Sequence, residues 1–214
     1  MDSEPSWSST GESISLVLGD ASCEAIAGDS LAGLNRFVVG TTAATGRLLT
    51  VTAVDAPLPP PDETYVRGDD WVSTHPTTNE WPFRLQAYRG LRRLPSCRGF
   101  AMTLTLSLQT PLLETRPRLL VSSYIVDKPL GVRGDRAVAE LDGFMLASTP
   151  HPTDASECET VETPDGSAAH EFAPSFLEKG VIRRVRFALV AFPSDQAPDA
   201  AIDEWSEAPL PLTA

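Results

Sequence analysis

Residues 100–108, Phe-Ala-Met-Thr-Leu-Thr-Leu-Ser-Leu, decide the fold class of this 214-residue chain. Apolar side chains alternate with small or polar ones throughout the stretch; the apolar set is Phe100, Met102, Leu104, Leu106 and Leu108. A period of two places these side chains on one face of a β-strand, whereas a helix would scatter them around its axis. The stretch therefore predicts a strand in which Leu104 and Leu106 are fully buried.

Similar apolar patterns recur on both sides of this stretch and predict a mainly β protein. Strands are expected at residues 13–18, 36–39, 47–54, 65–75, 83–88, 118–126, 136–147 and 180–192. So many strands without intervening helices favour an antiparallel two-sheet β-sandwich, with a barrel as the alternative. We expect one domain over residues 1–214, with residues 1–12 flexible.

Only short segments indicate helix or loop. A short C-terminal helix is expected at residues 198–207, and single helical turns at 23–27 and 173–179. The run Ala-Pro-Leu-Pro-Pro-Pro-Asp at 56–62 cannot continue a central strand and predicts a connector. Loops are expected at the basic residues 91–95 and at the acidic residues 151–169.

Two segments resemble each other and suggest an internal duplication. Arg47-Leu48-Leu49 leads through a connector to Val66-Arg67-Gly68-Asp69, and Arg118-Leu119-Leu120 leads similarly to Val132-Arg133-Gly134-Asp135. Chance is an equal alternative, because these residue types are common in the chain. A true duplication would give each half a similar strand–connector–strand unit.

The charge balance limits the partners that the surface can bind. The chain carries 29 acidic against 17 basic residues, a net charge of -12. Such a balance opposes binding to nucleic acid and to anionic membranes over most of the surface. The acidic excess lies mostly in residues 154–171 and 195–207, whereas the body between Arg84 and Arg136 is rich in arginine. We therefore expect neither a nucleic-acid partner nor a membrane partner.

The cysteines and the N-terminal residues indicate a cytoplasmic protein. Cys23, Cys97 and Cys158 are far apart and odd in number, which favours free thiols over a disulfide framework or a zinc site. The first residues lack the pattern of a secretory signal, and no apolar run is long enough to span a membrane. Phosphate-binding and dinucleotide-binding motifs are absent, so we expect no cofactor and no metal.

The segment 65–90 holds the strongest candidates for a binding site. It concentrates large polar and aromatic side chains, of which the candidate ligand-binding residues are Arg67, Trp71, Trp81, Arg84, Gln86 and Tyr88. Sugars offer apolar C–H faces to aromatic rings and hydroxyls to arginine and amide groups. Packing between strands is the plainer alternative. The set predicts a non-enzymatic module that binds a small polar, sugar-like ligand or a partner protein.

A sugar-modifying enzyme is the alternative function. His75 follows Asp69 and Asp70 closely in sequence, and a histidine that acts as a general base is oriented by a carboxylate. The alternative therefore assigns acid/base roles to His75 with Asp69 or Asp70. A histidine at the surface or at a hairpin tip, without any catalytic role, is the simpler interpretation.

Four motifs together resemble a group of uncharacterised bacterial β-rich proteins. They are Tyr65–Asp70, Phe83–Tyr88, Phe100–Leu108 and Phe176–Phe187, the last followed by the Pro-Leu-Pro-Leu-Thr end. The resemblance spans the chain from about Ser13 onward. It implies a β-rich fold, and it implies no activity, cofactor or catalytic residue.

Overall fold

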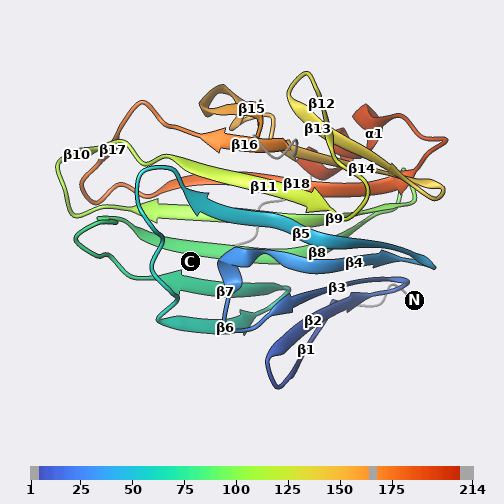
Figure 1. Ribbon diagram of the computed structural model, residues 1–214, viewed down its shortest axis with the longest axis horizontal. Helices are drawn as coiled ribbons and strands as arrows, with labels where there is room; N and C mark the ends of the chain where they lie inside the picture. The colour runs from blue at the N-terminus through green and yellow to red at the C-terminus, as the bar shows by residue number, and fades with distance from the viewer. Residues whose placement is uncertain (1–4, 164–167, 208–214) are drawn as a thin grey trace.

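Two eight-stranded antiparallel sheets pack face to face in the computed structural model, which describes residues 5–163 and 168–207 (Figure 1). In spatial order the first sheet contains β1 (Ser6–Thr10), β2 (Ser13–Leu18), β3 (Ala21–Ile26), β4 (Leu34–Val39), β5 (Thr42–Ala53), β11 (Leu119–Ile125), β16 (Ala168–Phe172) and β15 (Cys158–Glu162). The second contains β12 (Gly131–Arg133), β13 (Arg136–Leu141), β14 (Phe144–Pro150), β18 (Arg183–Pro193), β9 (Gly99–Gln109), β8 (Arg84–Leu94), β7 (Asp70–His75) and β6 (Glu63–Arg67). The sheets stay open, so the predicted sandwich is confirmed and the barrel is wrong.

Shorter elements complete the molecule. A two-stranded sheet pairs β10 (Glu114–Thr115) with β17 (Leu177–Glu178) at one end of the long axis (Figure 1). Two 3-10 turns, η1 (Ser30–Ala32) and η2 (Ala155–Glu157), and the helix α1 (Pro198–Glu207) are the helical elements of the described residues. The helix matches its predicted bounds. No helix among residues 5–163 and 168–207 is both long and apolar enough to cross a membrane.

The alternating stretch at 100–108 forms the central strand that it predicts. β9 lies between β8 and β18 in the middle of the second sheet. Leu104 and Leu106 are both fully buried, as the period of two requires. They belong to one large core between the sheets, to which both sheets contribute. On the other face of the second sheet, Ile202 and Trp205 of α1 pack in a smaller cluster with Phe192.

The two similar segments occupy related positions in the sandwich. β5 and β11 are neighbours inside the first sheet, and β9 and β18 are neighbours in the middle of the second. β5 leads to the hairpin β6–β7 at one edge of the second sheet, and β11 leads to the hairpin β12–β13 at the other edge. Both hairpins turn at a glycine with positive φ, 55° at Gly68 and 67° at Gly134. The duplication itself stays a prediction, with chance similarity as the alternative.

On both open sides of the sandwich, a similar hydrogen bond connects the edge strand of the first sheet to a hairpin turn of the second. In each case a side chain from an edge strand of the first sheet donates a hydrogen bond to the aspartate carbonyl of a Gly-Asp hairpin turn. Trp7 Nε1 of β1 lies 3.0 Å from the Asp69 oxygen, and Thr160 Oγ1 of β15 lies 2.7 Å from the Asp135 oxygen. The two hydrogen bonds hold the sheet edges together.

Within the N-terminal residues 1–12, for which flexibility stays a prediction, residues 6–10 form β1, and Trp7 packs against Trp71 and donates to the Asp69 carbonyl. Several local predictions are wrong. The helical turn predicted at 23–27 is part of β3, and the one at 173–179 contains β17. The basic segment 91–95 continues β8 through Leu94, and the acidic segment 151–169 contributes η2, β15 and the start of β16.

The segment 65–75 is also not the single strand that we predicted. Gly68, whose φ is positive, forms a tight turn with Asp69, so β6 and β7 fold back on each other with Arg67 opposite Asp70. The turn breaks the period of two, and side chains before and after it no longer share the predicted face. The predicted pairing of the next two strands is confirmed as β7 with β8.

A close approach between β5 and β11 provides a first test of the fold. A Cβ atom at Gly46 would lie 2.0 Å from the carbonyl oxygen of Tyr124. Because this oxygen belongs to the backbone of β11, the strand itself would have to shift to relieve the clash. We expect Gly46→Ala to lower the free energy of unfolding by about 1 to 3 kcal/mol in urea titrations. Gly131→Ala is the matched control, because its Cβ would have no neighbour within 4 Å. Equal stability of the two variants would show that β5 and β11 do not pair in this register.

Candidate functional site

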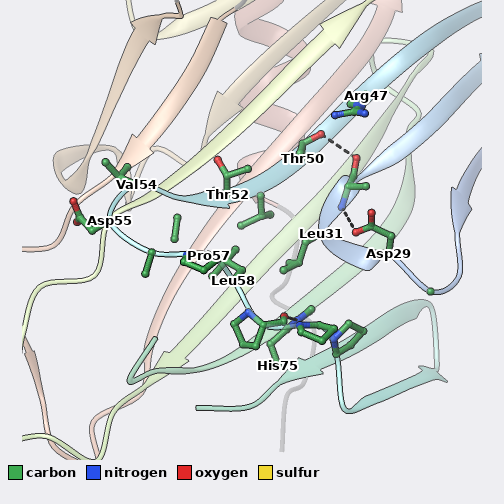
Figure 2. Close-up of a pocket in the computed structure, with 18 residues that line it drawn as sticks. Asp29, Leu31, Arg47, Thr50, Thr52, Val54, Asp55, Pro57, Leu58 and His75 are labelled. Carbon is green, nitrogen blue, oxygen red and sulfur yellow. Dashed lines mark hydrogen bonds between the residues drawn. The ribbon is translucent and has the colours of Figure 1, made fainter. Parts of the chain in front are cut away.

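A groove of about 870 Å³ lies where the chain crosses from the first sheet to the second. Its walls are the end of β5, the η1 turn and the proline-rich connector between β5 and β6 (Figure 2). This volume is within the range of roughly 300 to 1,000 Å³ that is common for small-molecule sites. The groove is therefore the candidate site.

The connector forms a rigid wall of the groove. Pro57 and the run Pro59-Pro60-Pro61 line it together with Leu58. Each proline ring fixes its own φ, and each also restricts the residue before it to extended conformations. The Pro59 carbonyl is held by His75, whose Nδ1 lies 2.8 Å away. A ligand would thus meet a wall whose shape is largely set before binding.

His75 is a buried, neutral anchor for this wall. A carbonyl oxygen can only accept, so Nδ1 carries the proton and donates it to Pro59. Nε2 is then the acceptor, and it lies 3.2 Å from Ser30 Oγ and 3.1 Å from Ser73 Oγ. Burial lowers the pKa of His75 below its usual value, and the charge of Arg89 lowers it further. At neutral pH the imidazole therefore stays uncharged.

Arg89 is the buried cation next to this network. Its side chain is almost fully buried in the core, where Nη2 donates to the carbonyl of Leu49 at 3.3 Å. Leu49 has a left-handed φ of 53°, at a bulge in the pairing of β5 with β11. The guanidinium also lies 5.8 Å from the ring centre of Trp71. Burial lowers the pKa of Arg89 to about 10, which still leaves it charged at neutral pH.

The η1 turn forms the opposite wall and is fixed at both ends. Asp29 caps it, because its Oδ1 accepts from the Ala32 backbone N–H at 3.1 Å. The Ala32 carbonyl accepts from the Thr50 hydroxyl at 3.0 Å, which ties the turn to β5. Gly33 follows with φ of 79°, and a Cβ there would lie 2.2 Å from the Leu48 oxygen. Only glycine fits this position.

The groove combines hydrogen-bonding groups with apolar surfaces. Its polar groups come from Asp29, Arg47, Thr50, Thr52 and Asp55, and its apolar side chains include Leu31, Val54 and Leu58. Asp55 forms an ion pair with Arg118 at 3.5 Å. Arg47 is exposed and makes no ion pair with any of the described residues. The groove can therefore offer carboxylate acceptors, hydroxyls and the guanidinium of Arg47 to one ligand.

The predicted aromatic residues do not line this groove. Trp71 is buried in the core between the sheets, with its ring centre 6.1 Å from that of Trp7. Trp81 is buried against Phe83 at a ring distance of 4.7 Å. For these two residues the structure favours the packing alternative.

The other predicted ligand residues lie on the outer face of the second sheet. Val72 pairs with Tyr88, which places Tyr88 and Gln86 on the face opposite to Trp71. Arg67 and Arg84 share this outer face and are exposed. Tyr88 is buried, and its hydroxyl donates to Gln86 Oε1 at 3.0 Å. Four of the six predicted residues, Arg67, Arg84, Gln86 and Tyr88, thus share one face of the sheet. Gln86 and Tyr88 are hydrogen-bonded to each other.

The structure does not bring His75 to the predicted carboxylates. Asp70 begins the six-residue strand β7 and His75 ends it, so they stand about 16 Å apart at about 3.3 Å per residue. Asp69 lies in the turn beyond Asp70. The surface position expected for His75 is also wrong, because its side chain is fully buried. Among residues 5–163 and 168–207, no three His, Cys, Asp or Glu side chains are grouped to hold a metal ion.

The groove residues were not predictable from the sequence, because they come from two distant segments. Asp29 precedes a three-residue turn and Thr52 is the second-last residue of β5, and neither has a distinctive neighbourhood in sequence. The proline-rich connector was the one available signal, since a rigid crossover between sheets creates a concave surface.

The sequence matches no protein-family model, and it matches no curated protein.

Proposed function

We propose that the protein is a non-enzymatic binding module that holds a small polyhydroxylated, sugar-like ligand in the groove beside the connector. The observation that carries the proposal is the combination of a rigid proline wall with polar side chains on the facing β5 strand. Arg47 donates hydrogen bonds, Asp29 accepts them, and Thr52 does both, which suits hydroxyl groups. The proline rings and Leu58 offer apolar surfaces to the C–H faces of a sugar ring.

The affinity of monosaccharides for groove variants tests the proposal. We expect the Arg47→Gln, Thr52→Val double variant to bind at least about tenfold more weakly than wild type, because it removes a charged and a neutral hydrogen bond. Both side chains are exposed, so the fold should be unaffected. The measurement is a chemical-shift titration with glucose, galactose, mannose and N-acetylglucosamine.

The matched control is the Arg67→Gln, Thr64→Val double variant on the exposed edge strand β6. It makes the same chemical changes outside the groove and should bind like wild type. Equal affinity of the groove variant and wild type would refute the groove as the site. Loss of binding in the control alone would move the site to the outer face that carries Arg67.

A sugar-modifying enzyme is the second candidate, and one observation favours it. His75 lines the groove, and its proton is on Nδ1, so Nε2 carries the free lone pair that a general base needs. As a general base it would exchange its contacts with Ser30 and Ser73 for a substrate hydroxyl. Proton spectra of a bound sugar, followed over hours, separate the candidates: the binding proposal predicts an unchanged sugar, and conversion that stops in His75→Gln would favour the enzyme.

A further inference from the structure

An apolar patch covers the end of the molecule that carries the small β10–β17 sheet. The patch consists of exposed large side chains from the segments around this sheet: Leu112, Leu113, Phe176, Val181 and Ile182. Leu113 is 82% exposed and Ile182 is 53% exposed. The segments lie side by side, because Gly180 N donates to the Thr110 oxygen at 3.1 Å and Glu114 pairs with Glu178. Large exposed apolar side chains grouped on neighbouring segments are a common feature of interaction sites.

Cations surround this patch although the protein as a whole is acidic. The exposed cations on the flanking segments are Arg84, Arg116, Lys179 and Arg184, and none forms an ion pair with a described residue. The exposed carboxylates of the small sheet are Glu114 and Glu178. Glu80, on the nearby β7–β8 loop, instead lines a depression beside the connector. Arg183 next to Ile182 is paired with Glu157, and Arg118 is paired with Asp55 and Glu171. Among the groups on these segments that form no ion pair with a described residue, four cations face the two carboxylates Glu114 and Glu178.

We propose that this end patch is a docking surface for an anionic lipid membrane. Leu113 and Ile182 would enter the boundary between headgroups and acyl chains, and the four cations would contact acidic headgroups. Amphipathic surfaces bind membranes through buried apolar area combined with attraction to anionic lipid. Each cation near such a surface strengthens binding by about fivefold.

The net charge of -12 does not prevent this orientation. Charges farther away than the Debye length, about 8 Å at physiological salt, are largely screened, so the charges around the patch decide the interaction. The geometry also favours a lipid surface over a protein. The exposed apolar side chains belong to segments around β10 and β17 at one end of the molecule (Figure 1), and a fluid acyl layer accepts such side chains without a matching pocket.

Vesicle co-sedimentation of the full chain tests the proposal. We expect wild type to bind vesicles of phosphatidylcholine with phosphatidylserine, and to bind vesicles of phosphatidylcholine alone at least about tenfold more weakly. The Leu113→Ser, Ile182→Ser variant should lose at least about tenfold in partitioning to the acidic vesicles. The matched control, Val17→Ser, Val126→Ser, replaces exposed valines elsewhere on the surface and should bind like wild type.

Three results would overturn the proposal: no binding of wild type to acidic vesicles, equal binding of the patch variant and wild type, or equal loss in the control. Sedimentation velocity measures whether the chain self-associates, which would be expected if the patch bound a second copy instead of a membrane. Self-association that disappears in the patch variant, without vesicle binding by wild type, would assign the patch to a second copy of the chain instead.

Discussion

Leu104→Ala is expected to lower the free energy of unfolding by about 2 to 5 kcal/mol. Leu104 is fully buried in the middle of β9, which is itself the central strand of the second sheet. Its neighbours across the strand ladders are Phe187 and Arg89, on backbones held by pairing to both sides. The surroundings can therefore collapse little into the cavity that the truncation leaves, which favours a large loss.

Urea or thermal unfolding measures this loss, with Leu113→Ala as the control. The same truncation at the exposed Leu113 should change stability by no more than about 0.5 kcal/mol. A Leu104→Ala protein as stable as the control would mean that the apolar face of residues 100–108 does not form the core.

Acidification is expected to destabilise the protein through His170. This side chain is almost fully buried between Ser148 and Thr160, with both ring nitrogens 3.0 Å from a hydroxyl oxygen. Burial lowers the pKa of His170 to about 4, whereas the unfolded chain has the usual value of about 6.5. Between pH 6.5 and pH 4 the imidazole of His170 is mostly protonated in the unfolded state and mostly neutral in the folded state. Stability is thus complete above pH 6.5 and falls as the pH drops towards 4, by about 3 kcal/mol from this group.

The comparison of wild type with His170→Gln isolates this contribution, because carboxylates titrate in both proteins. Unfolding free energies at several pH values should fall less steeply for the variant between pH 6.5 and pH 4. An imidazole titration by NMR provides a second readout in the folded protein. Parallel curves for the two proteins, or an ordinary pKa for His170, would show that its ring is accessible to water.

The core of the fold was predictable because residues 100–108 alternate between apolar and small or polar side chains at every position. Five alternating apolar side chains leave one choice of secondary structure and one buried face. The errors arose where tertiary contacts override local preference. The acidic residues 158–162 form β15 because they can pair along β16, and Arg92 and Arg93 remain in β8 because β9 provides a long partner strand.

The candidate site was less predictable because face and register depend on pairing. In a continuous strand Arg67 and Trp71 would lie on the same face. The turn at Gly68 and Asp69 reverses the chain, so the two side chains lie on opposite faces of the second sheet. The groove itself depends on the crossover between sheets, which no period in the sequence encodes. The proline run predicted the connector at residues 56–62. That Asp29 and Thr52 line the same groove is seen only in the structure.

A crystal structure of the protein soaked with the tightest-binding monosaccharide tests the central claim most directly. The groove proposal predicts density for one sugar ring between β5 and the connector, with hydroxyls within hydrogen-bond distance of Arg47 and Thr52. Density on the outer face beside Arg84 and Tyr88, with an empty groove at a sugar concentration that saturates binding in solution, would contradict it.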